Sequence, residues 1–132
     1  MPSIERINPP TLAAPPGGRY AHVVRAGSLV WIAGQTARNA AGELVGPGDA
    51  LAQSRQVYEN LRAAMESVGG GLEHLTKVTV YLTREVDVAA SRQAQDEYAA
   101  AHPVPASTMV VIKALARPEY LVEIEAFAVL PG

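Results

Sequence analysis

A strict alternation of side chains marks residues 121–129 as a β-strand. One side of this strand carries small or branched apolar residues that suit packing against helices, namely Val122, Ile124, Ala126 and Ala128. The other side places two carboxylates, Glu123 and Glu125, among large apolar groups. A carboxylate in such company must reach water, find a partner or have a shifted pKa. The strand therefore predicts either solvated acids on an exposed sheet face or an acid that lines a cleft.

Similar patterns predict the other strands of the fold. Segment 29–33 is apolar on both sides, which is typical of a central strand. Gly34 ends it, as a β-bulge or a close backbone approach would. The remaining strands are expected at residues 4–7, 21–25, 76–83 and 107–112.

Helical spacing predicts two helices, at residues 49–68 and 87–101. Asp49 and Asp87 are the expected N-caps, and one of the glycines at 69–71 is expected to form a left-handed cap after the first helix. Polar residues of the first helix, including Gln53 and Asn60, lie off its apolar stripe. With Ser54 filling a gap, that stripe comprises Leu51, Tyr58, Leu61, Met65 and Val68.

The order of elements predicts one α+β domain over residues 1–132, with both helices on one face of a single mixed sheet. No helix remains to cover the other face of the sheet. The residues expected on that face are Trp31, Tyr81, Met109, Val111 and Phe127. They are too apolar to be left in water, so we expect the chain to self-associate.

Composition excludes several classes of function. The 132 residues carry a net charge of −2, and Lys and Arg form no run, which argues against nucleic acid or an anionic membrane surface as partner. The lack of cysteine excludes disulfides, thiolate metal sites and cysteine catalysis. His22, His74 and His102 lack metal-ligand spacing and are interpreted as ordinary surface or loop residues, so no metal is expected. Without a membrane span or the apolar core of a signal peptide, the expected compartment is the cytoplasm.

Four stretches resemble the RidA family, also called the YjgF family, over nearly the whole chain. They are GGRYAHVVRAGSLVWIAGQ, QSRQVYENLRAAMESVGGGLEHLTKVTVYLT, PASTMVVIKAL and LVEIEAFAV. The resemblance implies a chorismate-mutase-like fold and a homotrimer whose sheets form a central barrel, with clefts between subunits. It also implies hydrolysis of reactive enamine or imine acids, such as 2-aminoacrylate, to 2-keto acids and ammonia, without metal or cofactor.

The resemblance also implies roles for three residues. Tyr20 matches the cleft tyrosine of the family, and Gly34 matches the glycine whose backbone lines the cleft. Glu123 matches the glutamate thought to hold the attacking water. We therefore expect Glu123 and Tyr20 to be the catalytic pair.

Other positions depart from the family pattern. Ser107 stands where the family has its substrate-binding arginine, and Ala33 where it has a small polar residue. Arg92 aligns with a cleft asparagine, and Arg19 replaces the proline before the tyrosine. Serine cannot form the bidentate pair that arginine makes with a carboxylate. The chain thus resembles an arginine-lacking branch, in which Arg19 and Arg92 are candidate replacement cations and Ser107, Ala33 and Gly34 complete the expected ligand contacts.

Three functions stay open at this point. The first is a deaminase that acts on an enamine or imine, and the retention of Tyr20, Gly34 and Glu123 favours it. The second is a trimeric protein that binds a small carboxylate or imine metabolite without turnover, which the serine at position 107 favours. The third is a ribonuclease, which an acidic chain without basic clustering disfavours.

Overall fold

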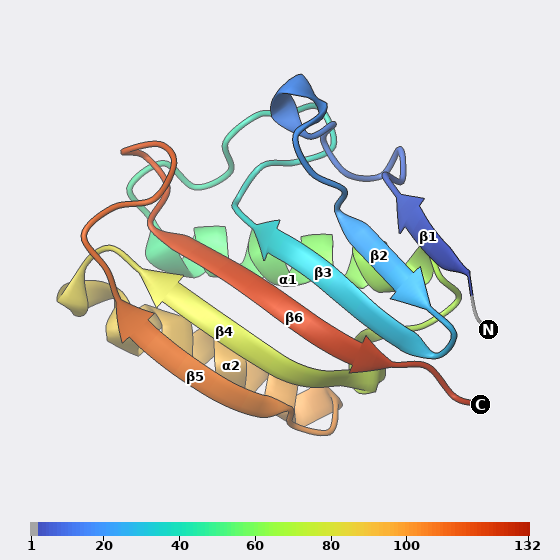
Figure 1. Cartoon of the computed structure of the whole chain (residues 1–132). Helices are drawn as coiled ribbons and strands as arrows, with labels where there is room; N and C mark the ends of the chain where they lie inside the picture. Colours follow the sequence, from blue (N-terminus) through green and yellow to red (C-terminus); the bar gives the residue numbers. More distant parts are fainter. Residues whose placement is uncertain (1–2) are drawn as a thin grey trace.

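The computed structural model describes residues 3–132, which form one six-stranded sheet with two α-helices (Figure 1). The strands are β1 (Ile4–Ile7), β2 (Val23–Ala26), β3 (Leu29–Gln35), β4 (Leu75–Leu82), β5 (Ala106–Val111) and β6 (Val122–Val129). They lie in the order β1-β2-β3-β6-β4-β5, and only β4 and β5 are parallel. A parallel pair requires a long crossover, which α2 supplies. This architecture confirms the predicted α+β fold with a mixed sheet.

Both helices cover the same face of the sheet, which lies in front of them in Figure 1. Helix α1 (Ala50–Glu66) begins as predicted at Asp49, whose Oδ1 accepts a hydrogen bond from the Ala52 amide at 3.0 Å. Beyond its C-terminus Gly69 has a φ of +77°, which confirms the left-handed glycine. Short 3₁₀ turns occupy η1 (Pro16–Gly18), η2 (Leu72–His74) and η3 (Glu85–Asp87).

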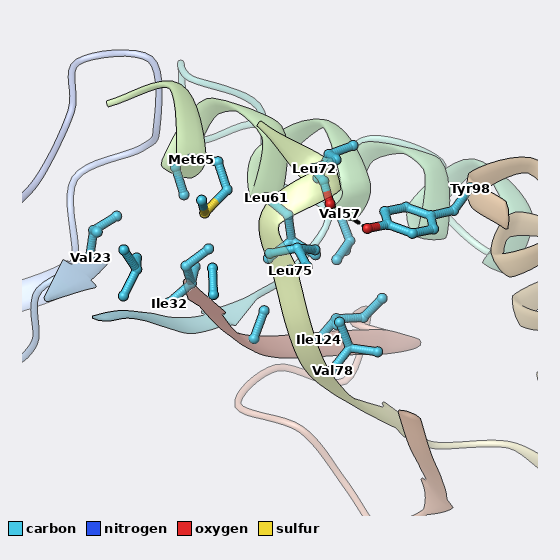
Figure 2. Close-up of a cluster of buried hydrophobic side chains, with 14 of the residues drawn as sticks. Val23, Ile32, Val57, Leu61, Met65, Leu72, Leu75, Val78, Tyr98 and Ile124 are labelled. Carbon is cyan, nitrogen blue, oxygen red and sulfur yellow. Dashed lines mark hydrogen bonds between the residues drawn. The ribbon is translucent and has the colours of Figure 1, made fainter. Parts of the chain in front are cut away.

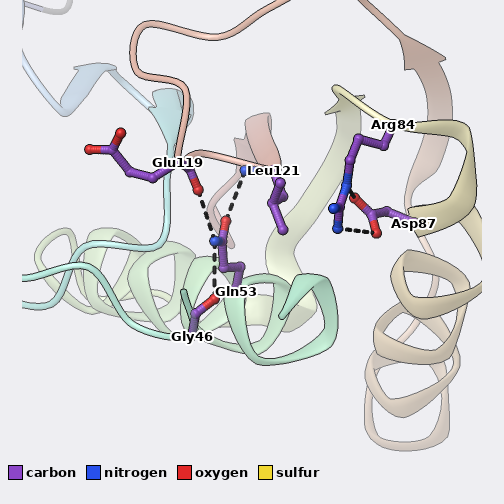
Figure 3. Close-up of polar contacts among 6 residues, drawn as sticks. All are labelled: Gly46, Gln53, Arg84, Asp87, Glu119 and Leu121. Atoms are coloured by element: carbon purple, nitrogen blue, oxygen red, sulfur yellow. Dashed lines mark hydrogen bonds and ion pairs between the residues drawn. The ribbon is translucent and has the colours of Figure 1, made fainter. Parts of the chain in front are cut away.

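Helix α2 (Val88–Ala101) starts where the sequence predicts, but not with the predicted capping bond. The Asp87 side chain makes no cap hydrogen bond. Its two oxygens instead accept hydrogen bonds from Arg84 at 2.7 and 2.8 Å (Figure 3). Asp87 is buried, and a buried carboxylate is better satisfied by a guanidinium than by one amide.

The core lies between the helices and the sheet (Figure 2). The apolar side of β6 is buried along its whole length, which confirms the facing predicted for that strand. In α1 the buried stripe differs from the prediction, because Gln53 and Asn60 are buried whereas Leu51 and Tyr58 are only half-buried. Burial of the two amides is possible because their polar atoms are hydrogen-bonded, as described below.

The helix-free face of the sheet exposes large apolar side chains. Trp31 and Phe127, which pair across β3 and β6, are 40% and 46% exposed, and Leu29 and Val129 lie beside them. The prediction for β5 was wrong by one residue. Met109 is paired with Val80 and Val111 with Leu82, so both face the helix side, and Val110 lies on the helix-free face with Tyr81. No helix among residues 3–132 is long and apolar enough to span a bilayer.

Candidate functional site

A cleft of about 470 Å³ opens at the end of the sheet where β3 ends and β6 begins. Its walls come from η1 and the segment after it, the end of β3 with the loop that follows, and the loop between β5 and β6. These segments gather at one end of the sheet in Figure 1. The structure brings five of the predicted site residues into this cleft, namely Arg19, Tyr20, Ala33, Gly34 and Glu123.

A bulge in β3 forms one wall. Between the Ile32–Ala126 and Gln35–Ile124 pairs, β3 has one residue more than β6, so its backbone bends at Ala33 and Gly34. The Gly34 Cα comes close enough to Glu123 that a Cβ built there would lie 2.7 Å from the carboxyl carbon. The glycine thus makes room for the acid. Both alternatives that the sequence offered for Gly34, a bulge and a close approach, occur together.

Glu123 and Glu125 have different surroundings although they share one side of β6. Glu123 lines the cleft and is half-buried. Burial raises the pKa of its carboxyl, and the negative charge of Glu125 adds to that shift. Glu125 lies outside the cleft lining, and its Oε2 accepts a hydrogen bond of 3.1 Å from the Tyr81 hydroxyl. The cleft therefore has one acid poised to accept a proton.

Tyr20 packs against His22, which was interpreted from the sequence as an ordinary surface or loop residue and which lies buried in the loop before β2. His22 is only 5% exposed, and its ring packs edge-on against Tyr20 with centroids 5.7 Å apart. Gln35 Nε2 lies 3.1 Å from His22 Nδ1 and also donates to the Ala33 carbonyl. Since the amide nitrogen donates, Nδ1 accepts, and Nε2–H donates to the Ala13 carbonyl at 2.6 Å. These bonds give both ring nitrogens a partner, which explains how a histidine is accommodated in the interior.

Two arginines of the cleft were not predicted. Arg38 follows β3, and Arg117 lies in the loop between β5 and β6. The sequence interpretation missed both because loop residues carry no periodic signal. The position of Arg38 shortly after Gly34, at the same strand end, was the one available indication.

Two buried amides of α1 hold the loops that carry these arginines. Asn60 Nδ2 donates to the carbonyls of Thr36 and Arg38, both at 2.9 Å.

Gln53 Nε2 donates to the carbonyls of Gly46 and Glu119, and its Oε1 accepts from the Leu121 amide at 2.9 Å (Figure 3). Hydrogen bonds from the buried side of α1 thus hold the loops that form part of the cleft wall.

The other two predicted residues lie elsewhere in the chain. Arg92 is on the exposed side of α2. Ser107 is on the helix side of β5, where its hydroxyl accepts a 3.3 Å hydrogen bond from Gln95 Nε2, and it lines a separate hollow of about 220 Å³. Within one chain neither residue reaches the cleft of Glu123.

The cleft combines one proton-accepting carboxylate, the two phenols of Tyr20 and Tyr120, and three guanidinium groups, which suits an anionic ligand and proton transfer. Among residues 3–132, no group of three or more His, Cys, Asp or Glu side chains has the arrangement to hold a metal ion.

The mixed sheet with both helices on one face defines an α+β protein of the chorismate-mutase-like class. Residues 11–130 match the family model described as Endoribonuclease L-PSP. A RutC family protein of Pyrococcus horikoshii is 38% identical over 117 residues, which make up 88% of this chain and 90% of that protein. The chain belongs to the Rid family, which is also called the YjgF, RutC or endoribonuclease L-PSP family. The family resemblance is thereby confirmed.

More distant relatives have names that mention a chemistry or a ligand. The 2-iminobutanoate/2-iminopropanoate deaminase of Dermatophagoides farinae is 27% identical over 128 residues, covering 97% of this chain and 98% of that protein. Among solved structures, RidA from an Antarctic Psychrobacter has a TM-score of 0.85 at 32% identity, covering 96% of this chain and 99% of that one. Escherichia coli TdcF, solved with bound serine, has a TM-score of 0.88 at 26% identity, with the same two coverages.

Proposed function

We propose that this protein hydrolyses a reactive enamine or imine to a carbonyl compound and ammonia, with Glu123 as the general base. The observation that carries the proposal is the carboxyl of Glu123, half-buried in the cleft, with its pKa raised by burial and fitted against Gly34. A carboxylate with a raised pKa is a stronger proton acceptor while it is ionised. The Dermatophagoides relative, whose name states an imine deaminase, adds support.

The proposed reaction needs only water and the side chains of the cleft. An enamine substrate first tautomerises to the imine. Water held by Glu123 then adds to the imine carbon, its oxygen forming the new bond while Glu123 takes its proton. That proton passes to the nitrogen, which gives a carbinolamine. Glu123 then moves the hydroxyl proton of the carbinolamine to the same nitrogen, and the carbon–nitrogen bond breaks as the carbonyl forms, which releases ammonia. Tyr20 hydrogen-bonds the substrate or the water, and the backbone at Ala33 and Gly34 lines the position of the reacting carbon.

The proposal includes a homotrimer whose clefts lie between subunits. Trp31 and Phe127 on the helix-free face supply the apolar surface that such an assembly would bury. In the trimer, Ser107 and Arg92 are proposed to reach a neighbouring subunit's cleft as ligand contacts, with Arg19 contributing from its own chain. Because serine stands at position 107, the protein represents an arginine-lacking branch, and turnover of 2-aminoacrylate is expected to fall far below that of relatives with arginine there.

The test is hydrolysis of imines generated in situ, with 2-aminoacrylate and 2-iminobutanoate as first substrates and keto acid as the readout. Glu123→Gln is expected to abolish turnover while preserving the trimer, because an amide can hold water but cannot take its proton. Glu125→Gln is the matched control and should retain activity within a few-fold. Full activity in Glu123→Gln would refute the assigned base.

Binding without turnover is the alternative function, and the cluster of guanidinium groups around the cleft favours it as the second candidate. If the parent hydrolyses none of the imines tested but binds carboxylates in the same cleft, the protein is a metabolite-binding member of its family.

A further inference from the structure

The positive charges of the cleft are largely unpaired within the chain. Among residues 3–132, Arg19 and Arg38 make no ion pair, and Arg117 has only a long contact of 3.9 Å with Glu119. Both partners of that contact are well exposed, which screens it. Three guanidinium groups thus line a cleft whose own lining contains a single carboxyl, Glu123. Such an excess of positive charge calls for an anionic ligand.

Of the three arginines, Arg38 is the most constrained by its surroundings. It is half-buried, and its Nη2 donates to the Ala14 carbonyl at 3.4 Å. Its backbone is held by Asn60 and by a bridge to Leu44. An arginine on a backbone held in this way has less freedom to lose when it pairs with a carboxylate.

Arg117 approaches the cleft from another segment. Its carbonyl accepts a 3.2 Å hydrogen bond from the Tyr120 amide, and Gln53 anchors the loop through Glu119 and Leu121. Arg19 instead folds over η1, with its Cζ 3.5 Å from the position of a Cβ at Gly17, and it lies at the exposed rim. Two cations carried by separately held loops therefore line the same cleft.

We propose that the cleft selects a ligand with two carboxylates, one paired with Arg38 and the other with Arg117. This inference deepens the proposed function by naming a dicarboxylic imine as the substrate class, and it rests on that function only for turnover. A monocarboxylate would leave one guanidinium without an anion, whereas a dicarboxylate satisfies both. A volume of about 470 Å³ accommodates a short dicarboxylic chain with room for water.

The test is titration calorimetry on the full chain at fixed ionic strength. Succinate, glutarate and adipate are the dicarboxylate probes, and propionate, butyrate and valerate are the monocarboxylate probes. At least one dicarboxylate is expected to bind about tenfold more tightly than every monocarboxylate. Arg38→Gln and Arg117→Gln should each remove that preference, whereas Arg62→Gln, at a partly exposed arginine of α1 outside the cleft, should leave it unchanged.

Equal affinities for the two probe series would overturn the proposal, as would a preference that survives both substitutions. If Arg38→Gln does not fold, the exposed Arg117 provides the same test. The outcome is separable from that of the proposed function. Hydrolysis of a monocarboxylic imine without preference for dicarboxylates would refute this inference alone, and dicarboxylate binding without hydrolysis of any imine would refute the deaminase alone.

Discussion

Gly34 and Glu123 are packed so closely that the acid occupies the space a side chain at position 34 would need. A Cβ at Gly34 would lie 2.7 Å from Cδ and 2.9 Å from Cγ of Glu123, closer than carbon atoms normally approach. Gly34 is not among the glycines with positive φ. The requirement for glycine at this position therefore comes from space and not from backbone conformation.

Gly34→Ala is expected to displace the Glu123 carboxylate from the cleft. The backbone tolerates alanine, so the loss of stability should be on the order of 1–3 kcal/mol, from overpacking. Hydrolysis of whichever imine the parent accepts, or ligand affinity if there is no turnover, should fall by about tenfold or more. Steady-state kinetics and a urea titration measure the two effects.

A double-mutant cycle shows whether the effect of Gly34→Ala passes through Glu123. On a Glu123→Ala background, the methyl group meets empty space, so Gly34→Ala should cost almost no further stability or affinity. Equal losses on both backgrounds would mean that alanine disturbs β3 itself and that the contact with Glu123 is incidental.

Glu123→Gln is expected to stabilise the protein at neutral pH. The pKa of Glu123 is raised in the fold, chiefly by burial, so the folded state disfavours the ionised acid. Below the ordinary pKa of glutamate the acid is protonated in both states, and the fold has its full stability. That stability is lost as the pH rises through the raised pKa of the folded state. Glutamine resembles the protonated acid and cannot ionise. The variant should melt above the parent at about pH 7, and the two should converge at about pH 4.

Thermal melts across that pH range measure the difference, with Glu85→Gln at an exposed position as the control. A parent that is more stable than Glu123→Gln at neutral pH would indicate that a cation compensates the buried charge, and Arg38 would then be the first candidate.

The sequence was sufficient to predict the fold because periodicity and end signals agree. The alternation in β6, the Asp49 cap and the glycines after α1 each indicated the element that the structure contains. The errors of the sequence-based prediction concerned which side of an element each side chain faces. The register of β5 depends on its pairing with β4, which no local pattern encodes, so Met109 and Val111 were assigned to the wrong side.

The site was predictable only where a residue sits on a regular element or matches a family stretch. Glu123 and Gly34 met both conditions, and the structure places them in contact. Arg38 and Arg117 lie in loops. The hydrogen bonds that hold the backbone of these loops come from Asn60 and Gln53 on α1, which is distant in the sequence. Burial of His22 likewise depends on a hydrogen bond with Gln35, which lies at the end of β3. Such long-range polar contacts are invisible to a scan of local sequence.

Gln53→Leu is expected to destabilise the fold on the order of 3 kcal/mol, because it leaves a buried amide and two carbonyls without their partner. The loop that carries Arg117 should loosen with it. Urea denaturation measures the first effect, and hydrogen exchange at Leu121 the second. Gln93→Leu, on the exposed side of α2, is the matched control. If the two variants have equal stability, Gln53 does not anchor the loop in solution.

Trp31→Glu is expected to convert the proposed trimer into single chains. Trp31 pairs with Phe127 across β3 and β6 at the centre of the helix-free face, and both rings are exposed within one chain. A carboxylate placed there would have to be buried unpaired in the assembly, a larger penalty than leaving the remaining apolar groups in water. The substitution removes no core contact, so circular dichroism should show an unchanged fold. Val86→Glu, at a side chain that is 76% exposed in η3, is the control and should leave the assembly intact.

Sedimentation equilibrium at micromolar concentration measures the mass. The parent should sediment as three chains and Trp31→Glu as one. A single-chain parent would refute the trimer and would also remove Ser107 and Arg92 from the proposed site, because within one chain both lie away from Glu123.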